Sequence, residues 1–352
     1  MLLQSRVMST SKISALLRSS LGSSVLLVGS KHEKSDWAVA THPLIAQKDG
    51  AHLSRKIVSP VDKLGLDLRL YQYQTCPYCS KVRSVLDYYG FSYEVVEVNP
   101  VTRSQLKFAK GYKKVPVVTT AKSEDALVES SQIISILKSY MILPNRSFKE
   151  ILDYYPRHET VENGKTVVVY PNKNYIMHEN KRLSQDEIQA VREENQWREW
   201  VDEKFIHIIS PNVYRTFGEA LETFHYFDQV GEWKRNFPAW ERALAIYLGA
   251  TAMYFISKRL KKRHGIVDER EAMLGAFKEF LKAKGPDRKF LGGDNPNLAD
   301  LSLHGAITSF LGTRTFKELS KECEIEKWFN DTQQAINEHR GAKLLADRSH
   351  SN

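Results

Sequence analysis

The chain has 352 residues, a formal net charge of +9 and only three cysteines. This length favours two compact domains with appended segments, and so few cysteines exclude a disulfide-based scaffold. The apolar fraction of 42% is sufficient for buried cores. A modest positive charge does not by itself indicate nucleic-acid binding, and no recognition module for nucleic acid is visible in the sequence.

The first 62 residues read as a leader and a linker. Residues 1–32 contain no acidic residue and carry four cations among many serines, which is typical of a mitochondrial transit peptide. The alternatives are a disordered tail or a membrane anchor over residues 13–28, although that stretch includes Arg18 and is shorter than the ~20 apolar residues of a spanning helix. We therefore expect a mitochondrial location. An anchor would instead indicate the Golgi or another membrane, with release to the cytoplasm.

The stretch around Cys76 and Cys79 dominates the first half of the chain. Leucines alternate with polar residues over 66–71, which predicts a strand, and apolar residues at helical spacing over 82–89 predict a helix that Gly90 ends. The two thiols therefore lie where a strand meets the N-terminus of a helix. The helix dipole and free backbone N–H groups at such a place stabilise a thiolate.

Three interpretations of the cysteine pair are open. A zinc site needs four ligands, and the only other cysteine is Cys323, so we predict no metal site. Inert buried thiols are the second interpretation. Thiol chemistry is the third and preferred one, because a Cys-x-x-Cys pair after a strand is typical of thioredoxin-like motifs. In it, Cys76 is the reactive thiol and Cys79 its support.

Residues 65–142 read as one thioredoxin-like α/β domain. After the first strand and helix we expect a strand over 93–98, a short helix near 103–109, a strand at 115–118, another at 126–129, and a last helix. A cis peptide at Val115-Pro116 would explain a proline beside a β-branched run, the alternative being a trans proline at the start of an edge strand. Ser130 stands where an N-cap belongs. It either helps that helix N-terminus bind a carboxylate or simply caps its own helix.

Residues 143–190 read as an insertion, and residues 191–345 as an all-α domain. Asn163-Gly164 between short apolar runs predicts a small hairpin. A long helix is expected from about Ala239, and it ends in the cationic run 258–263. Arg259 and Arg263 share a face of that helix and could clamp carboxylates of an anionic ligand. The alternatives are a solvated helix end or, with little support, a nuclear-targeting signal.

A second specific stretch follows at 290–300. Asn297 is expected to cap a helix, with Asp300 bonding back to the cap, as a folding device rather than a catalytic one. His304 is expected to lie in the core.

The tetrapeptide 76–79, Lys114-Val115-Pro116 and Glu129-Ser130-Ser131 resemble the three ligand-facing segments of glutaredoxins and glutathione transferases. The resemblance implies glutathione binding at Val115, Pro116, Glu129 and Ser130. The backbone of Val115 would pair with the cysteinyl part, and Glu129 and Ser130 would hold the γ-glutamyl group. The implied fold is an α/β thioredoxin-like domain followed by an all-α glutathione-transferase-like domain.

Longer strings at residues 70–83, 95–101, 209–216 and 252–261 resemble the microsomal prostaglandin E synthase type 2 family. This resemblance implies an isomerase that converts the lipid endoperoxide prostaglandin H2 to prostaglandin E2, a homodimer, and membrane association through the N-terminus. Tyr73 and Cys76 match the family's catalytic tyrosine and cysteine, and Cys79 its second cysteine. Haem bound with glutathione is also implied, with Arg259 and Arg263 meeting its carboxylates. Glu129 departs from the aspartate common in the family.

Two other functions stay open at this stage. A glutaredoxin-like thiol-disulfide oxidoreductase or a general glutathione transferase would use the same tetrapeptide. A non-enzymatic protein that binds haem and glutathione is the third possibility. Turnover of prostaglandin H2, compared with reduction of a glutathione mixed disulfide, separates these functions.

Overall fold

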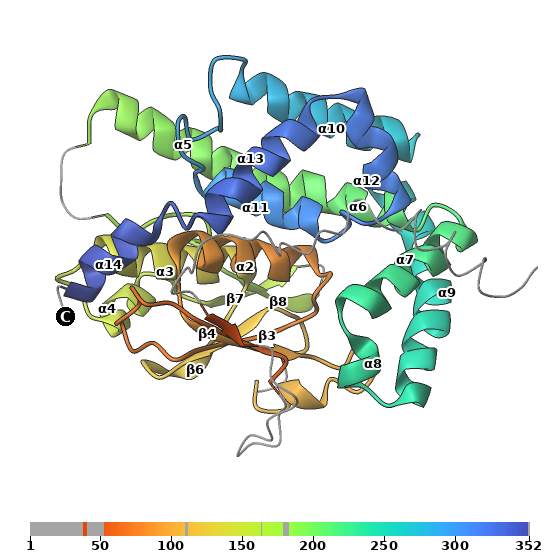
Figure 1. The fold of residues 1–352 in the computed structure, drawn as a ribbon, viewed down its shortest axis with the longest axis horizontal. Helices are drawn as coiled ribbons and strands as arrows, with labels where there is room; N and C mark the ends of the chain where they lie inside the picture. The colour runs from red at the N-terminus through yellow and green to blue at the C-terminus, as the bar shows by residue number, and fades with distance from the viewer. Residues whose placement is uncertain (1–37, 41–52, 110–111, 163, 179–182, 351–352) are drawn as a thin grey trace, which may run out of the picture. The chain divides into compact units, whose positions relative to one another are not determined.

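The computed structural model describes residues 38–40, 53–109, 112–162, 164–178 and 183–350. These all belong to one compact unit, residues 37–352 (Figure 1). The predicted leader, residues 1–32, lies outside the described residues, as does the alternative membrane segment at 13–28. Within the described ranges, no helix has the length and apolar character needed to cross a membrane.

The first half of the described chain, residues 38–178, is built on a mixed six-stranded sheet. Its spatial order is β1 (Ala38–Ala40), β2 (Arg55–Val58), β4 (Tyr93–Glu97), β3 (Leu68–Gln72), β5 (Val117–Thr120) and β6 (Ser123–Val128). The central pair β3 and β4 is parallel, with Leu70 opposite Val95, and the remaining pairs are antiparallel. The predicted strands of the thioredoxin-like domain are thus present.

The sheet extends further than the sequence indicated. Residues 55–58 were predicted as linker, but they form β2, which pairs with β4, and Ser54 donates from its backbone N–H to the carbonyl of Val95 at 2.8 Å. Strand β2 has only four residues, which alternate between partly buried and exposed positions. An alternating pattern this short is not enough to identify a strand from the sequence. The short helix expected near 103–109 is likewise reduced to one 3₁₀ turn, η1 (Ser104–Leu106).

Two helices lie between this sheet and the helices of the second half (Figure 1). Helix α2 (Pro77–Tyr89) begins directly after Cys76, with Pro77 in its first turn, and ends at Gly90 in the left-handed conformation, φ 75°. Its buried apolar residues pack with those of α3 (Ser130–Ile142) in the main core. The strand, dithiol and helix therefore follow one another as predicted.

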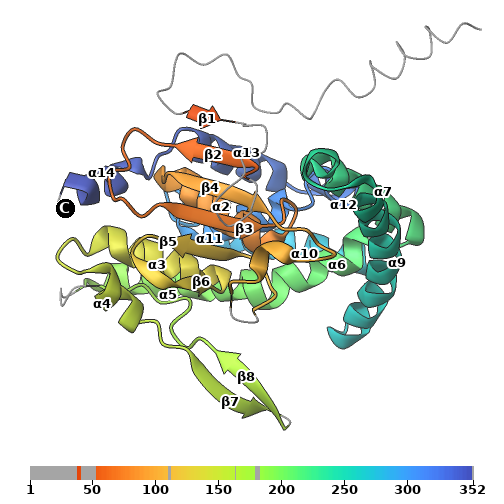
Figure 2. The same cartoon turned by 90° about the horizontal axis from the view of Figure 1, so that it is seen from below.

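The insertion contains α4 (Phe148–Asp153) and the predicted hairpin, formed by β7 (His158–Glu162) and β8 (Lys165–Val169). Figure 2 shows the hairpin projecting from the rest of the described chain. The segment after it returns to α3, where the backbone N–H of Met177 donates to Ser139 Oγ at 2.8 Å and the Tyr155 hydroxyl donates to the Tyr175 carbonyl at 2.8 Å. The insertion is thus fastened to the helix that begins at Ser130.

The second half of the described chain, residues 183–350, is helical, as predicted. Its elements are α5 (Gln185–Trp200), the π-helical segment η2 (Val201–Phe205), α6 (Ile206–Val213), α7 (Phe217–Val230), α8 (Trp233–Asn236), α9 (Ala239–Arg263), α10 (Glu269–Lys284), α11 (Leu298–Thr308), α12 (Arg314–Leu319), the 3₁₀ turn η3 (Ser320–Glu322), α13 (Ile325–Asn337) and α14 (Ala342–His350). Pro211 lies inside α6, which continues to Val213.

Helix α11 is the main contact of the second half with α2. Its capping box is formed as predicted, because Asn297 Oδ1 accepts from the N–H of Asp300 at 3.0 Å while Asp300 Oδ2 accepts from the N–H of Asn297 at 3.1 Å. His304 is buried, stacked on Phe329, and its Nδ1 lies 3.1 Å from Ser84 Oγ. It is the core histidine that was expected.

The last helix returns to the first half. The Arg348 guanidinium in α14 donates to the carbonyls of Pro144 and Arg146, at 2.7 and 3.1 Å. Before it, the N–H of Gly341 donates to the carbonyl of Tyr88 at 3.1 Å.

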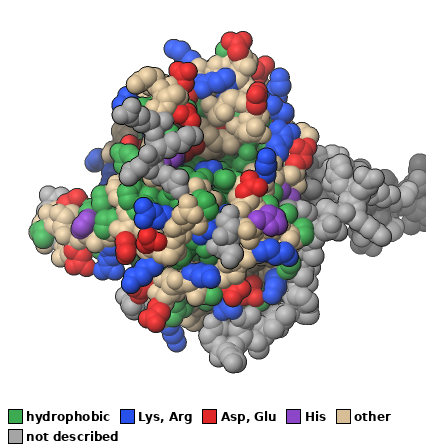
Figure 3. All heavy atoms as spheres, turned by 90° about the vertical axis from the view of Figure 1, so that its left-hand side faces the viewer, with side chains coloured by type: hydrophobic (Ala, Val, Ile, Leu, Met, Phe, Trp, Pro, Cys, Tyr) green, Lys and Arg blue, Asp and Glu red, His purple; other side chains and the backbone are tan. Residues whose placement is uncertain are grey.

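On the face seen in Figure 3, basic and acidic side chains are interspersed, so the net positive charge does not gather there in one patch.

Candidate active site

The cysteine pair lies at the N-terminus of α2. Cys76 is the residue before the first turn and is partly exposed, whereas Cys79 is fully buried. The N–H of Cys76 donates to the Tyr73 carbonyl at 3.1 Å, which folds the loop between β3 and α2. The Cys76 sulfur is therefore accessible and the Cys79 sulfur is not, as expected for a nucleophile and its supporting thiol.

The surroundings of the two thiols separate their pKa values. The hydrogen bond from the Cys79 thiol lowers the pKa of Cys76, and the backbone N–H groups of Cys79 and Tyr78 and the charge of Arg83 act in the same direction. Burial raises the pKa of Cys79 well above its ordinary value, and its hydrogen bond to Cys76 adds to that rise. Cys76 is therefore the thiol of the pair that loses its proton first.

Tyr73 follows β3 and is partly buried near both sulfurs. Burial raises its pKa, and the charges of Cys76 and Cys79 contribute to the rise, whereas a side-chain hydrogen bond with Arg103 opposes it. Tyr73 thus keeps its proton at neutral pH and can donate a hydrogen bond. Arg103 was not singled out from the sequence, because nothing in its local pattern marks it.

The predicted cis peptide at Val115-Pro116 is present. It immediately precedes β5, whose first residue, Val117, pairs with Tyr71 of β3 and Val128 of β6. Val115 and Ser130 therefore stand at the same end of the sheet as the loop that carries Cys76. The structure brings together the three segments that resemble glutaredoxins and glutathione transferases.

The start of α3 differs from the expectation in one respect. Ser130 does not precede the helix but is its first residue, and the cap position falls to Glu129, which has φ 69° and makes no side-chain cap bond. Ser130 Oγ is buried and has no hydrogen-bond partner within the part of the chain that the structure describes. A hydroxyl at the N-terminus of a helix, free of a cap role, fits an anionic group such as a glutathione carboxylate.

Two tyrosines that the sequence analysis missed border this region. The hydroxyl of Tyr112 accepts a hydrogen bond from the backbone of Glu129, and burial raises its pKa. Tyr214, which follows α6, is buried, and its pKa is raised by burial and by the nearby charge of Cys76. Its carbonyl accepts from Ser257 Oγ of α9 at 3.0 Å. Tyr214 is therefore a residue of the second half whose pKa responds to the charge of Cys76.

Arg259 and Arg263 lie in the last turns of α9, and both side chains are exposed. They are one helical turn apart, so the shared face predicted from their spacing is present. Two exposed guanidinium groups at this spacing suit a pair of carboxylates, but a solvated helix end has the same geometry. Their contact with haem stays a prediction.

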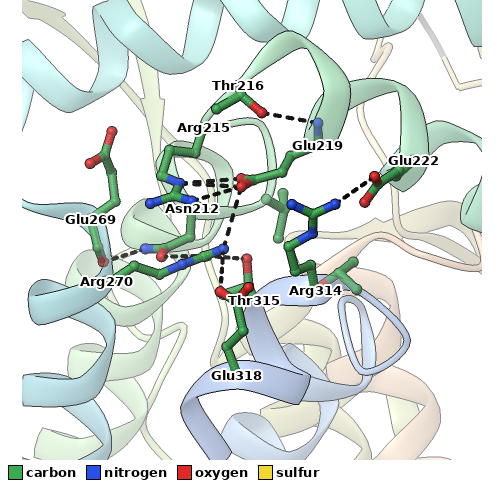
Figure 4. A network of polar contacts seen from close by, with 12 residues as sticks. Asn212, Arg215, Thr216, Glu219, Glu222, Glu269, Arg270, Arg314, Thr315 and Glu318 are labelled. Carbon is green, nitrogen blue, oxygen red and sulfur yellow. Dashed lines mark hydrogen bonds and ion pairs between the residues drawn. The ribbon is translucent and has the colours of Figure 1, made fainter.

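A separate cavity lies between α7 and α12 and contains none of the predicted site residues. It has a volume of about 350 Å³ and is lined by residues such as Glu219, Tyr226 and Arg314. Figure 4 shows the buried Glu219 carboxylate between the guanidinium groups of Arg215, at 2.9 Å, and Arg270, at 3.7 Å. Arg270 also pairs with Glu318 at 2.9 Å, so the two guanidinium groups are balanced by two carboxylates, and we assign the cavity no ligand.

Comparison with known proteins agrees with this architecture. Residues 70–140 match the family described as glutathione S-transferase, N-terminal domain. A mixed α/β domain that carries this match, followed by a helical region, defines a protein of the glutathione transferase fold, as predicted. Among solved structures, human glutathione transferase theta-2 in complex with glutathione is 17% identical, with a TM-score of 0.43, over 80% of this chain and 85% of that chain.

Two curated relatives are much more similar. Prostaglandin E synthase 2 of Mus musculus is 39% identical over 327 residues, which are 90% of this chain and 82% of the relative. Prostaglandin E synthase 2 of Danio rerio is 40% identical over 290 residues, 81% of this chain and 75% of the relative. The chain belongs to the prostaglandin E synthase 2 family. The predicted family and the prediction that the chain is an isomerase-type enzyme are thereby confirmed.

Proposed function

We propose that this protein binds glutathione and isomerises prostaglandin H2 to prostaglandin E2 at Cys76. The observation that carries the proposal is the placement of that sulfur: partly exposed, at a helix N-terminus, with a lowered pKa and a neutral tyrosine beside it. The relatives named prostaglandin E synthase 2 support the substrate. The match to the glutathione S-transferase N-terminal domain supports glutathione.

The residues at the site fit glutathione. Ser130 Oγ is buried without a partner among the described residues, at the start of α3, and is available to the γ-glutamyl carboxylate. Glu129, next to it, supplies a carboxylate for the α-amino group, and Val115, just before β5 at the same end of the sheet, offers its backbone to the cysteinyl part. When bound, glutathione supplies a second thiol beside Cys76.

The isomerisation needs no net oxidant. The Cys76 thiolate, or a glutathione thiolate that it positions, forms an S–O bond with one peroxide oxygen as the O–O bond breaks, and the other oxygen takes a proton to become a hydroxyl. Tyr73 donates a hydrogen bond to the leaving oxygen. Loss of the proton from the carbon that bears the sulfur-bound oxygen breaks the S–O bond, forms the ketone and returns the thiolate.

Turnover of prostaglandin H2 by the purified protein, with and without glutathione, tests the proposal. The wild type should form prostaglandin E2, and Cys76→Ser should lose that activity while keeping its fold by circular dichroism. Unchanged isomerisation in Cys76→Ser would refute the role of the sulfur.

A second candidate is a glutaredoxin-like thiol-disulfide oxidoreductase, and the opposite pKa shifts of Cys76 and Cys79 favour it. Reduction of a glutathione mixed disulfide at a rate above prostaglandin H2 turnover would select this function. Haem binding, the homodimer, the mitochondrial location and membrane association through the N-terminus remain predictions from the sequence and its family resemblance.

A further inference from the structure

A buried ion pair joins the helix of the dithiol to the second half of the chain. Lys81, in the second turn of α2, is 0% exposed, and Asp202, in the π-helical segment between α5 and α6, is 5% exposed. Lys81 Nζ donates to Asp202 Oδ1. In the described structure Lys81 and Asp202 are thus removed from water together.

Ser131 completes a triangle with this pair. Its hydroxyl accepts from Lys81 Nζ at 2.9 Å and donates to Asp202 Oδ2 at 2.6 Å. Its carbonyl accepts from the buried guanidinium of Arg198, in α5, at 3.0 Å. Two side chains of the second half therefore hold one residue in the first turn of α3.

That first turn is the part of α3 that faces the glutathione site. Glu129, directly before it, has φ 69°, a conformation that residues other than glycine keep only where the surrounding structure fixes it. Ser130, between Glu129 and Ser131, carries the buried hydroxyl without a partner. Contacts that fix Ser131 also fix the two residues expected to receive the γ-glutamyl group.

We propose that Asp202 is a positioning residue for the γ-glutamyl subsite: with Lys81 it anchors Ser131 and so holds Glu129 and Ser130 in the conformation that binds glutathione. The inference rests on the proposed function, because it assumes glutathione at Ser130. It assigns the second half of the chain a share in glutathione binding that it exerts without touching the ligand.

The chemistry of the triangle suits positioning better than stability. A buried ion pair adds little stability over apolar residues of the same size, because both charges lose their water. Burial alone would raise the pKa of Asp202, but the charge and hydrogen bond of Lys81, with the hydroxyl of Ser131, keep it below its ordinary value. The carboxylate therefore remains an acceptor for Ser131 throughout the neutral range.

Ser131→Ala is the direct test, because it removes the anchored hydroxyl and leaves the ion pair. Its affinity for glutathione, measured by calorimetry below the unfolding temperature, should fall at least tenfold, because the substitution removes both buried hydrogen bonds of this hydroxyl. The matched control is Ser139→Ala, two turns further along α3, whose buried hydroxyl bonds Tyr155 and Met177. This control should lose stability without losing affinity.

Two fragments of glutathione locate the effect. γ-Glutamylcysteine keeps the group in question and should lose affinity for Ser131→Ala by the same factor, whereas cysteinylglycine lacks it and should bind both proteins equally. A loss shared by all three ligands, or a Ser131→Ala protein that melts earlier but binds glutathione as the wild type does, would overturn the inference.

A double variant, Lys81→Met with Asp202→Leu, covers the case in which Ser131→Ala does not fold. It removes both charges together, so no buried charge is left unpaired, and it should fold but bind glutathione at least tenfold more weakly. Wild-type affinity in this variant would refute the positioning role. If the wild type itself binds no glutathione, the proposed function fails, and that result is distinct from failure of the positioning role.

Discussion

Gly305 of α11 packs against the backbone of Lys81 in α2, so closely that a Cβ on Gly305 would lie 2.5 Å from the Lys81 N and Cα atoms. The helix that carries the dithiol and the capped helix of the second half therefore meet backbone to backbone. A glycine is required at this position by space, not by a left-handed conformation.

Gly305→Ala should lower the free energy of unfolding by about 2 kcal/mol, because the backbone of Lys81 cannot move aside as a flexible side chain would. Urea denaturation followed by fluorescence measures the change. The matched control is Gly275→Ala in α10, where an added Cβ meets nothing within 4 Å. It should be neutral or stabilise by up to about 1 kcal/mol through helix propensity. Equal effects of the two substitutions would contradict the close contact.

The two thiols should differ in their reaction with iodoacetamide. Cys76 should alkylate at a pH below that of an ordinary cysteine, and Cys79→Ala should move its profile to higher pH, because the hydrogen bond from Cys79 is the largest contribution to its lowered pKa. Cys323→Ala serves as the background for both measurements. An unmoved profile would show that the helix N-terminus alone activates Cys76.

Tyr73→Phe should reduce kcat for prostaglandin H2 isomerisation by about a hundredfold, the usual effect of losing a hydrogen bond to a developing oxyanion. The affinity of this variant for glutathione should stay within about twofold of the wild type. Tyr73 lies near Cys76 and is not one of the residues proposed to bind the γ-glutamyl group. Tyr89→Phe, on the far end of α2, is the control and should keep full activity. A change confined to KM would place Tyr73 in ligand binding instead.

Asp300 should make the stability depend on pH. Burial raises its pKa to about 6, although the N–H groups of Leu291, Gly292 and Asn297 and the Trp328 indole oppose the shift. A folded-state pKa above the unfolded value of 3.8 favours the protonated folded form, so this stability is complete below about pH 4 and declines as the pH rises through 6.

Comparison with Asp300→Asn isolates this group from the other carboxylates. The stability of the wild type relative to the variant should decrease by about 2 kcal/mol between pH 4 and pH 7, measured by denaturation at each pH. A flat difference would show that the four donors cancel the effect of burial on the pKa of Asp300.

Much of the fold could be predicted because the signals are local. The alternating leucines before Cys76, the stop at Gly90, the cis proline and the Asn297 capping box each act within a few residues, and all are present. Strand β2 was not predicted, because it is defined by its long-range pairing with β4 and its four residues show no clear pattern of their own.

The site was predictable to a smaller extent. Cys76, Val115 and Ser130 were found because each lies in a short recognisable string, and the structure gathers those strings at one end of the sheet. Tyr214, Asp202 and Arg198 were not predicted as site residues, because their positions near the site depend on how the second half of the chain packs against the first. No spacing in the sequence indicates that Asp202 meets Lys81, 121 positions earlier.

The return of α14 to the first half has a consequence for biosynthesis. Gly341 lies against Tyr88 and Tyr89 so closely that an added Cβ would come within 2.7 Å of their rings, and Arg348 holds the carbonyls beyond α3. The ribosome makes all of the helices between α2 and α14 before these partners emerge. The dithiol helix therefore completes its packing only when a segment made long after it has emerged, and a stop codon before Gly341 would leave Tyr88 and Tyr89 without this cover.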